Sequence, residues 1–126
     1  MVPENLKYTD QHEWVRVEGD TATVGITDYA QHELGDIVYV ELPLAGTDVT
    51  ARKAFGVVEA VKTVSDLFAP VSGQVLAVNE TLGTDASIVN KSPYREGWMI
   101  KIKMSNQSDL EHLFSPEEYK RLIGEQ

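Results

Sequence analysis

A valine-rich segment at residues 55–67 constrains the fold of this chain more than any other part of the sequence. Two β-prone runs meet there, and Lys62 lies near their junction with no other basic residue between Lys53 and Lys91. The segment contains no Asn-Gly or Asp-Gly pair, so local turn chemistry does not place a tight turn at Lys62. It therefore predicts β-structure, and its residues alone leave open a hairpin or one long strand.

Strand patterns recur along the rest of the chain, each bounded by turn residues or proline. They span residues 6–8, 12–17, 21–26, 36–42, 74–78 and 98–104, with a short extended piece around Val49. Strict alternation places Val38 and Val40 on the same face of their strand, and it turns Met99 outward. The repeated strands predict a mainly β domain.

Two short helical segments interrupt the strands. Thr27 or Asp28 caps a helix of two turns that ends at Gly35, and one further helical turn is expected at residues 85–89. Around them, residues 35–40 and 73–78 share the order Gly-polar-apolar-apolar-x-Val. This similarity is either a coincidence in a valine-rich chain or a sign of a pseudo-twofold sandwich, and the sequence leaves both open.

The C-terminal region, at about residues 108–124, is predicted to be helical. Ser108 and Ser115 each begin a capping-box pattern, and a proline follows Ser115 at the first helical position. An apolar stripe is expected to pack this helix on the sheets. The stripe consists of Tyr119, Leu122 and Ile123.

Length and charge limit the classes of protein to which this chain can belong. A chain of 126 residues with 42% hydrophobic content fits a single domain over residues 1–126. It has no run of about 18 apolar residues, so no membrane span is predicted. The net charge of −9 argues against nucleic-acid binding. The acidity either serves solubility alone or steers the protein toward partners with basic surfaces.

The N-terminus lacks the basic start and apolar run of a signal peptide and the Arg-rich character of a transit peptide. We therefore expect a bacterial cytoplasmic protein, with the mitochondrial matrix as the alternative for a mature organellar form.

Few residues point to catalysis. The chain has no cysteine, which excludes disulfides, thiolate metal sites and a cysteine nucleophile. Its histidines show no metal-ligand spacing, and it contains neither a Gly-x-Ser-x-Gly elbow nor a phosphate-binding Gly-x-x-x-x-Gly-Lys loop. The histidines are His12, His32 and His112. We predict no catalytic residue and no metal site.

The residues around Lys62 carry a more specific signal. Glu59-Ala60-Val61-Lys62-Thr63 followed by Pro70-Val71-Ser72-Gly73 is similar to the attachment hairpin of lipoyl- and biotinyl-carrying domains. Further matching blocks are His12-Glu13-Trp14-Val15, Gly25-Ile26-Thr27-Asp28-Tyr29-Ala30, Leu34-Gly35-Asp36-Ile37-Val38, Val64-Ser65-Asp66, Ser92-Pro93-Tyr94 and Gly97-Trp98-Met99-Ile100-Lys101. With these blocks the sequence resembles the H-protein family of the glycine cleavage system over nearly its whole length.

The resemblance implies a barrel-sandwich hybrid of two antiparallel sheets, lipoyl-domain-like, with short helices and a C-terminal helix. Its hairpin core would span about residues 35–80. It also implies a monomeric, non-catalytic carrier with lipoate bound covalently to Lys62. The arm would reach roughly 14 Å from Cα to ring.

The same resemblance implies the partners. The arm would accept an aminomethyl group from the pyridoxal-phosphate glycine decarboxylase and present it to the tetrahydrofolate-dependent aminomethyltransferase. The flavoenzyme dihydrolipoamide dehydrogenase, which carries FAD, would reoxidise the arm, and a lipoyl-attaching enzyme would first load it.

Three residues match the family's functional positions, and a fourth, Glu59, lies three residues before Lys62. Lys62 would carry the cofactor, and Glu59 would be a recognition charge for the attaching enzyme. Glu13 and Asp66 would line a cleft for the loaded arm and hold the cationic amine with their carboxylates. The sequence departs from the family at Ala60, where serine is usual, at Thr63, where alanine is usual, and in the approach at residues 52–54.

Two alternatives share the hairpin. A lipoyl relay would donate the cofactor from Lys62 to other lipoyl domains. A biotin carrier is disfavoured, because such carriers prefer methionine on both sides of the lysine, and Val61 and Thr63 stand there instead.

Overall fold

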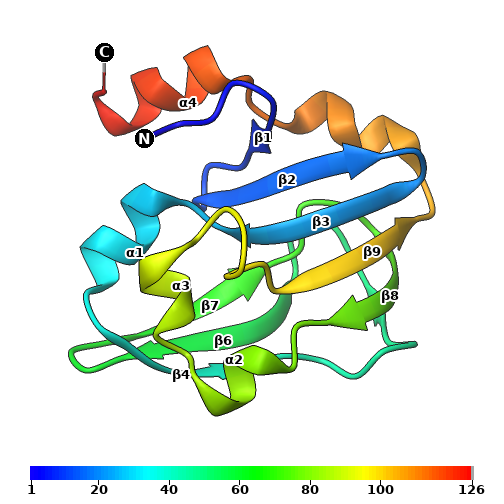
Figure 1. Cartoon of the computed structure of the whole chain (residues 1–126). Helices are drawn as coiled ribbons and strands as arrows, with labels where there is room; N and C mark the ends of the chain where they lie inside the picture. The colour runs from blue at the N-terminus through cyan, green and yellow to red at the C-terminus, as the bar shows by residue number, and fades with distance from the viewer. Residues whose placement is uncertain (126) are drawn as a thin grey trace.

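The fold consists of two antiparallel sheets with short helices around them (Figure 1). The structure is a computed structural model that describes residues 1–125. One sheet has six strands in the order β1-β2-β3-β9-β8-β5, and the other has three in the order β4-β6-β7. The predicted mainly β architecture with a C-terminal helix is confirmed.

The strands follow the sequence patterns closely. Their bounds are β1 Lys7–Tyr8, β2 Glu13–Glu18, β3 Thr21–Ile26, β4 Ile37–Glu41, β5 Asp48–Val49, β6 Ala54–Ala60, β7 Val64–Phe68, β8 Gly73–Val78 and β9 Ile100–Met104. The helices are α1 Asp28–Leu34, α2 Thr81–Thr84, α3 Ile88–Lys91, the 3-10 helix η1 Gln107–His112 and α4 Pro116–Ile123.

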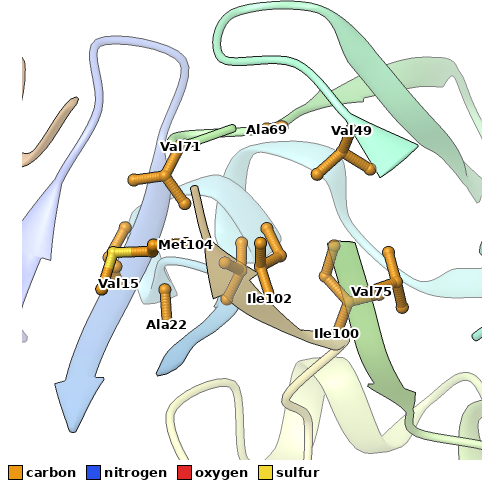
Figure 2. Close-up of a cluster of buried hydrophobic side chains, with 10 residues drawn as sticks. Val15, Ala22, Val49, Ala69, Val71, Val75, Ile100, Ile102 and Met104 are labelled. Atoms are coloured by element: carbon orange, nitrogen blue, oxygen red, sulfur yellow. The ribbon is translucent and has the colours of Figure 1, made fainter. Parts of the chain in front are cut away.

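Strand β9 completes the larger sheet by inserting between β3 and β8. Its isoleucines face inward, and the lysines between them are exposed, which is the alternation of a strand buried on one face. A cluster of valine, isoleucine and methionine side chains fills the space beneath (Figure 2). Leu42 and Phe55 pack against this cluster and against a second one under the smaller sheet. The two clusters therefore join the sheets.

Helix α1 forms as predicted. The Thr27 hydroxyl oxygen accepts a hydrogen bond from the backbone N–H of Ala30, which caps the first turn. Gly35 ends the helix with φ of 83°, in the region of positive φ that favours glycine. This turn brings the chain back beside the hairpin of β6 and β7 (Figure 1).

Strand β4 does not alternate strictly, which corrects the predicted faces. Val40 is buried while Val38 is 56% exposed, so these residues are not on one face. A register shift between Ile37 and Tyr39 supplies the extra residue of a β-bulge. The bulge turns both Ile37 and Val40 toward the core.

The prediction for Met99 is wrong. Its side chain is fully buried in the second cluster, because the strand begins only at Ile100 and the preceding residues follow a different course. The predicted helical turn at residues 85–89 begins later, at Ile88, and the short helix α2 was not predicted.

The C-terminal helix is also shorter than predicted. Ser115 caps α4 in a full capping box with Glu118, but the capping residue of the preceding 3-10 helix is Asn106 and not Ser108. Of the predicted stripe, Tyr119 is fully buried, whereas Leu122 is 49% exposed. Ile123 is partly buried and packs against the same cluster as Tyr119, so two of the three predicted residues hold the helix.

Candidate functional site

Lys62 lies at the tip of a hairpin, which decides between the two arrangements that the sequence left open. Strands β6 and β7 pair up to Glu59 and Val64, and residues 61–63 connect them. The turn is closed by a hydrogen bond of 2.8 Å from the backbone N–H of Ala60 to the carbonyl of Thr63. It is tied to the start of β4 because the Val61 N–H donates to the Asp36 carbonyl at 3.0 Å. The tip is therefore closed on itself and tethered on the side of β4.

The Lys62 side chain is exposed and forms no ion pair within residues 1–125. Its stem crosses the end of helix α1, since a Cβ placed at Gly35 would lie 3.6 Å from Lys62 Cε. No carboxylate of the described residues holds the amine, so the group is accessible to an enzyme that would acylate it.

A cleft of about 230 Å³ opens beside this hairpin, between helix α1, the start of β2 and strand β7. Side chains of both polar and apolar character line it. They include Gln11, His12, Glu13, Tyr29, Glu33, Leu34, Ser65, Asp66 and Leu67. The cleft brings Glu13 and Asp66 to one site from strands that lie in different sheets.

Glu13 is a buried acid, with 2% of its surface exposed. The Thr9 hydroxyl donates to one carboxylate oxygen at 2.6 Å, and the Phe68 N–H donates to the other at 3.3 Å. Burial raises the pKa of Glu13 to about 7, because these two hydrogen bonds only partly replace lost hydration. Glu13 also lines a second cavity of about 530 Å³. A cation entering the cleft would favour its charged form.

Asp66 lies on strand β7 at the edge of the smaller sheet, and its side chain is exposed. It is four residues from Lys62, so their Cα atoms are no more than about 14 Å apart along extended chain. A flexible group of similar length on Lys62 would reach this carboxylate. The exposed Asp66 and the buried Glu13 therefore form one acidic site in this cleft.

Glu59 does not join this cleft. It is half-buried and pairs with Tyr39 on one side and Val64 on the other. Since Val58 and Ala60 are buried, alternation turns Glu59 to the outer face of the smaller sheet. It lies one residue pair before the tip, where a protein that grips the hairpin would contact it.

Sequence reasoning missed His12 as a cleft residue. The ring lines the cleft next to Glu13, and His12 has a positive φ of 71°. Its partner Tyr119 comes from the other end of the chain, so no local pattern indicated the pairing. No group of three or more His, Asp or Glu side chains in residues 1–125 is arranged to hold a metal ion, and no helix described there is long and apolar enough to cross a membrane.

Two antiparallel sheets with a lysine at an exposed hairpin tip define the lipoyl-domain-like class of sandwich folds. The model of the family described as glycine cleavage H-protein matches residues 6–126. The chain therefore belongs to the glycine cleavage H-protein family.

Curated relatives agree over nearly the full length. The chain is 56% identical over 124 residues to the glycine cleavage system H protein of Staphylococcus carnosus, with 98% of each chain covered. It is 51% identical over 126 residues to that of Carboxydothermus hydrogenoformans, with 100% of this chain and 97% of the relative covered. The crystal structure of a glycine cleavage system H protein from Mycobacterium marinum superposes with a TM-score of 0.91 at 37% identity, covering 98% of this chain and 99% of that one.

Proposed function

We propose that this protein is the non-catalytic lipoyl carrier of a glycine cleavage system, with the cofactor in amide linkage to Lys62. The observation that carries the proposal is the exposed amine at a closed hairpin tip that is tethered to the start of β4 and lies beside an acidic cleft. An attaching enzyme needs a deprotonated amine on a rigid projection. The residues of the tip fit this requirement.

When bound, the lipoyl group supplies a disulfide that is reduced as one sulfur takes up an aminomethyl group. The partner that loads this cargo is glycine decarboxylase, with pyridoxal phosphate. The partner that removes it is the tetrahydrofolate-dependent aminomethyltransferase, and the FAD enzyme dihydrolipoamide dehydrogenase restores the disulfide. An arm that visits several active sites works through effective concentration, without new contacts.

Glu13 and Asp66 hold the cargo between these visits. An aminomethyl cargo carries a cationic amine, and two carboxylates within reach of the arm form charge-assisted hydrogen bonds with it. The apolar members of the cleft wall, Leu34 and Leu67, keep water away from the sulfur end. The anionic floor selects for the loaded arm over the empty one, because only the loaded arm brings a positive charge.

Glu59 is a recognition charge for the attaching enzyme. It lies beside the tip on the outer face of the smaller sheet, next to the half-exposed Tyr39 and the exposed Val64. A carboxylate between two apolar side chains gives an enzyme both a charge and a surface to grip. We place the carrier in the bacterial cytoplasm as a monomer, since the relatives named above are bacterial.

Reconstitution tests the proposal. Purified lipoylated protein would be assayed with the three partner enzymes for glycine-dependent release of CO2 and ammonia. Lys62→Arg is expected to abolish turnover, because arginine keeps the charge but offers no amine for acylation. Lys91→Arg is the matched control, since Lys91 is an exposed lysine at the end of helix α3, and it should keep full activity. Activity retained in Lys62→Arg would refute the assignment.

A further inference from the structure

A buried chain of hydroxyl groups links helix α4 to the cleft. The Tyr119 hydroxyl lies 2.8 Å from His12 Nδ1 and 2.8 Å from the Thr27 hydroxyl. Thr27 and Tyr119 are both fully buried, and the imidazole of His12 also packs against the Tyr29 ring with centroids 4.9 Å apart. These hydrogen bonds thus connect Thr27 at the cap of α1, Tyr119 of the C-terminal helix and His12 in the cleft wall.

The direction of these hydrogen bonds follows from the other partners of Thr27. The Thr27 oxygen accepts the Ala30 N–H, which is only a donor, so among residues 1–125 the Thr27 hydroxyl proton has Tyr119 as its sole acceptor. Buried hydroxyl groups rarely leave a proton unpaired. Tyr119 therefore accepts from Thr27 and must donate its own proton to His12 Nδ1.

This direction fixes the state of the imidazole. Nδ1 is an acceptor and carries no proton, so the ring proton is on Nε2. If His12 were protonated on both nitrogens, either Tyr119 or Thr27 would keep a buried proton with no acceptor. The network therefore opposes a positive charge on this ring.

The surroundings of His12 agree with a neutral ring. Burial lowers the pKa of His12, and the nearby charges of Asp10 and Glu33 only partly offset this. The other ionisable groups that line the cleft with His12 are Glu13, Tyr29 and Asp66. Burial also raises the pKa of Tyr119, so its hydroxyl keeps the proton that it donates.

We propose that the Thr27–Tyr119–His12 chain locks His12 as the neutral Nε2–H tautomer, and that this neutral ring is a positioning residue that leaves Glu13 and Asp66 free for a cationic cargo. This inference rests on the proposed function, in which the loaded arm occupies the cleft. A charged imidazole in the wall of this cleft would repel the cationic amine that the two carboxylates bind. The C-terminal helix thereby sets the charge preference of a cleft to which Tyr119 itself does not belong.

Nitrogen-15 NMR of the full chain without cofactor tests the tautomer directly. In the wild-type protein His12 should show a protonated Nε2 and a bare Nδ1. Tyr119→Phe is expected to raise the fraction of the Nδ1–H tautomer about fivefold or more, the factor that one hydrogen bond provides. Tyr94→Phe is the matched control, because its partially buried hydroxyl bonds Asp28 and Met1 and not His12, and it should leave the tautomer unchanged.

A second variant guards against a folding defect in Tyr119→Phe. Thr27→Val removes the proton that sets the direction of the chain and should shift the tautomer the same way, whereas Thr27→Ser keeps the hydroxyl and should match the wild type. A wild-type His12 that carries its proton on Nδ1, or tautomer fractions that are equal in Tyr119→Phe and Tyr94→Phe, would overturn the proposal.

The role in the cleft has its own readout. Because Tyr119→Phe no longer opposes a second proton on His12, the loaded, lipoylated variant should release ammonia several times faster than the wild type without partner enzymes, and Tyr94→Phe should not. Equal rates alongside a shifted tautomer would overturn the positioning role. A wild-type protein that takes no lipoyl group would refute the proposed function and its cleft role, whereas the NMR result on the tautomer would stand by itself.

Discussion

At the scale of single residues, Glu13 makes the account testable through pH. An unfolded glutamate ionises near 4.5, whereas the buried carboxyl keeps its proton up to a pKa of about 7. Between these values the folded state binds more protons, so the free energy of unfolding falls as the pH rises through this window and then levels off. The native carboxylate is thus held at a cost to stability.

Replacing Glu13 by glutamine removes that cost. Because burial raises the pKa of Glu13 from 4.5 to about 7, the free energy of unfolding of Glu13→Gln should rise relative to the wild type by up to about 3 kcal/mol from about pH 4 to about pH 8. Urea unfolding at both pH values measures it. Glu59→Gln is the control, because it leaves Glu13 in place and should keep the wild-type dependence. Parallel pH profiles for the wild type and Glu13→Gln would contradict the assignment.

The positions of site residues were predictable, but their environments were not. The motif around Glu13 indicated a cleft acid, yet its burial depends on Phe68 and Thr9, which approach from another strand and from a loop. His12 gave no signal in the sequence, because its partner is 107 residues away. Contacts of this kind form only when the sheets close.

At the scale of elements, the hairpin that carries Lys62 depends on close contact between β4 and β6. A Cβ at Gly56 would lie 2.2 Å from the carbonyl oxygen of Glu41, a backbone atom that cannot rotate away. Gly56→Ala should therefore force the strands apart and destabilise the protein by about 1–3 kcal/mol or more.

Gly83→Ala provides the contrast. Gly83 lies in helix α2 with nothing within 4 Å of an added Cβ, so alanine should be neutral or stabilise by up to about 1 kcal/mol. Thermal or urea unfolding compares the two variants. Equal stabilities would mean that the strand contact is looser than described.

Two serines near the C-terminus allow a comparison of helix caps. Ser115→Ala removes the capping-box hydroxyl of α4 and should cost about 1 kcal/mol in the free energy of unfolding. Ser108→Ala removes an exposed hydroxyl that bonds only Asn106, and its effect should stay within about 0.5 kcal/mol. A larger loss at Ser108 in urea unfolding would restore the capping role that its sequence pattern predicted.

Helices and strands with a clear hydrophobic period and local turn or cap residues were predicted well. Elements that depend on tertiary contacts were not. The β2–β3 hairpin and helix α1 carry their own turn and cap residues. The bulge in β4 has no local signature, because it arises where Ile37 and Val40 both meet the core. Helix α2 is four residues long and includes a glycine, so propensity did not favour it.

At the scale of the whole molecule, the net charge of −9 bears on how the proposed carrier would meet its partner enzymes. If the acidity steers it toward basic surfaces, the association rate with each partner enzyme should fall as salt rises, since charges are screened beyond about 10 Å at 0.1 M. Stopped-flow association at low and high salt measures this. A rate that does not change with salt would favour the other reading, in which the acidity serves solubility alone.

The arrangement of strands in space was the part of the fold that the residues alone could not supply. Local patterns identified β3, β8 and β9, but pairing β3 with β9 joins segments about 80 residues apart. The repeat at residues 35–40 and 73–78 left a sandwich of two sheets open, and only the family resemblance indicated a lysine at the apex. The resemblance and the hydrophobic pattern agree because the same valines that favour strands also fill the core between the sheets.

The central claim is that Lys62 alone carries the cofactor. Peptide mapping by mass spectrometry on protein expressed with a lipoyl-attaching enzyme tests it most directly. The account predicts a single lipoyl increment, found on the peptide that contains Lys62 and lost in Lys62→Arg. An increment on any other lysine, or none under conditions that modify a known lipoyl domain, would contradict it.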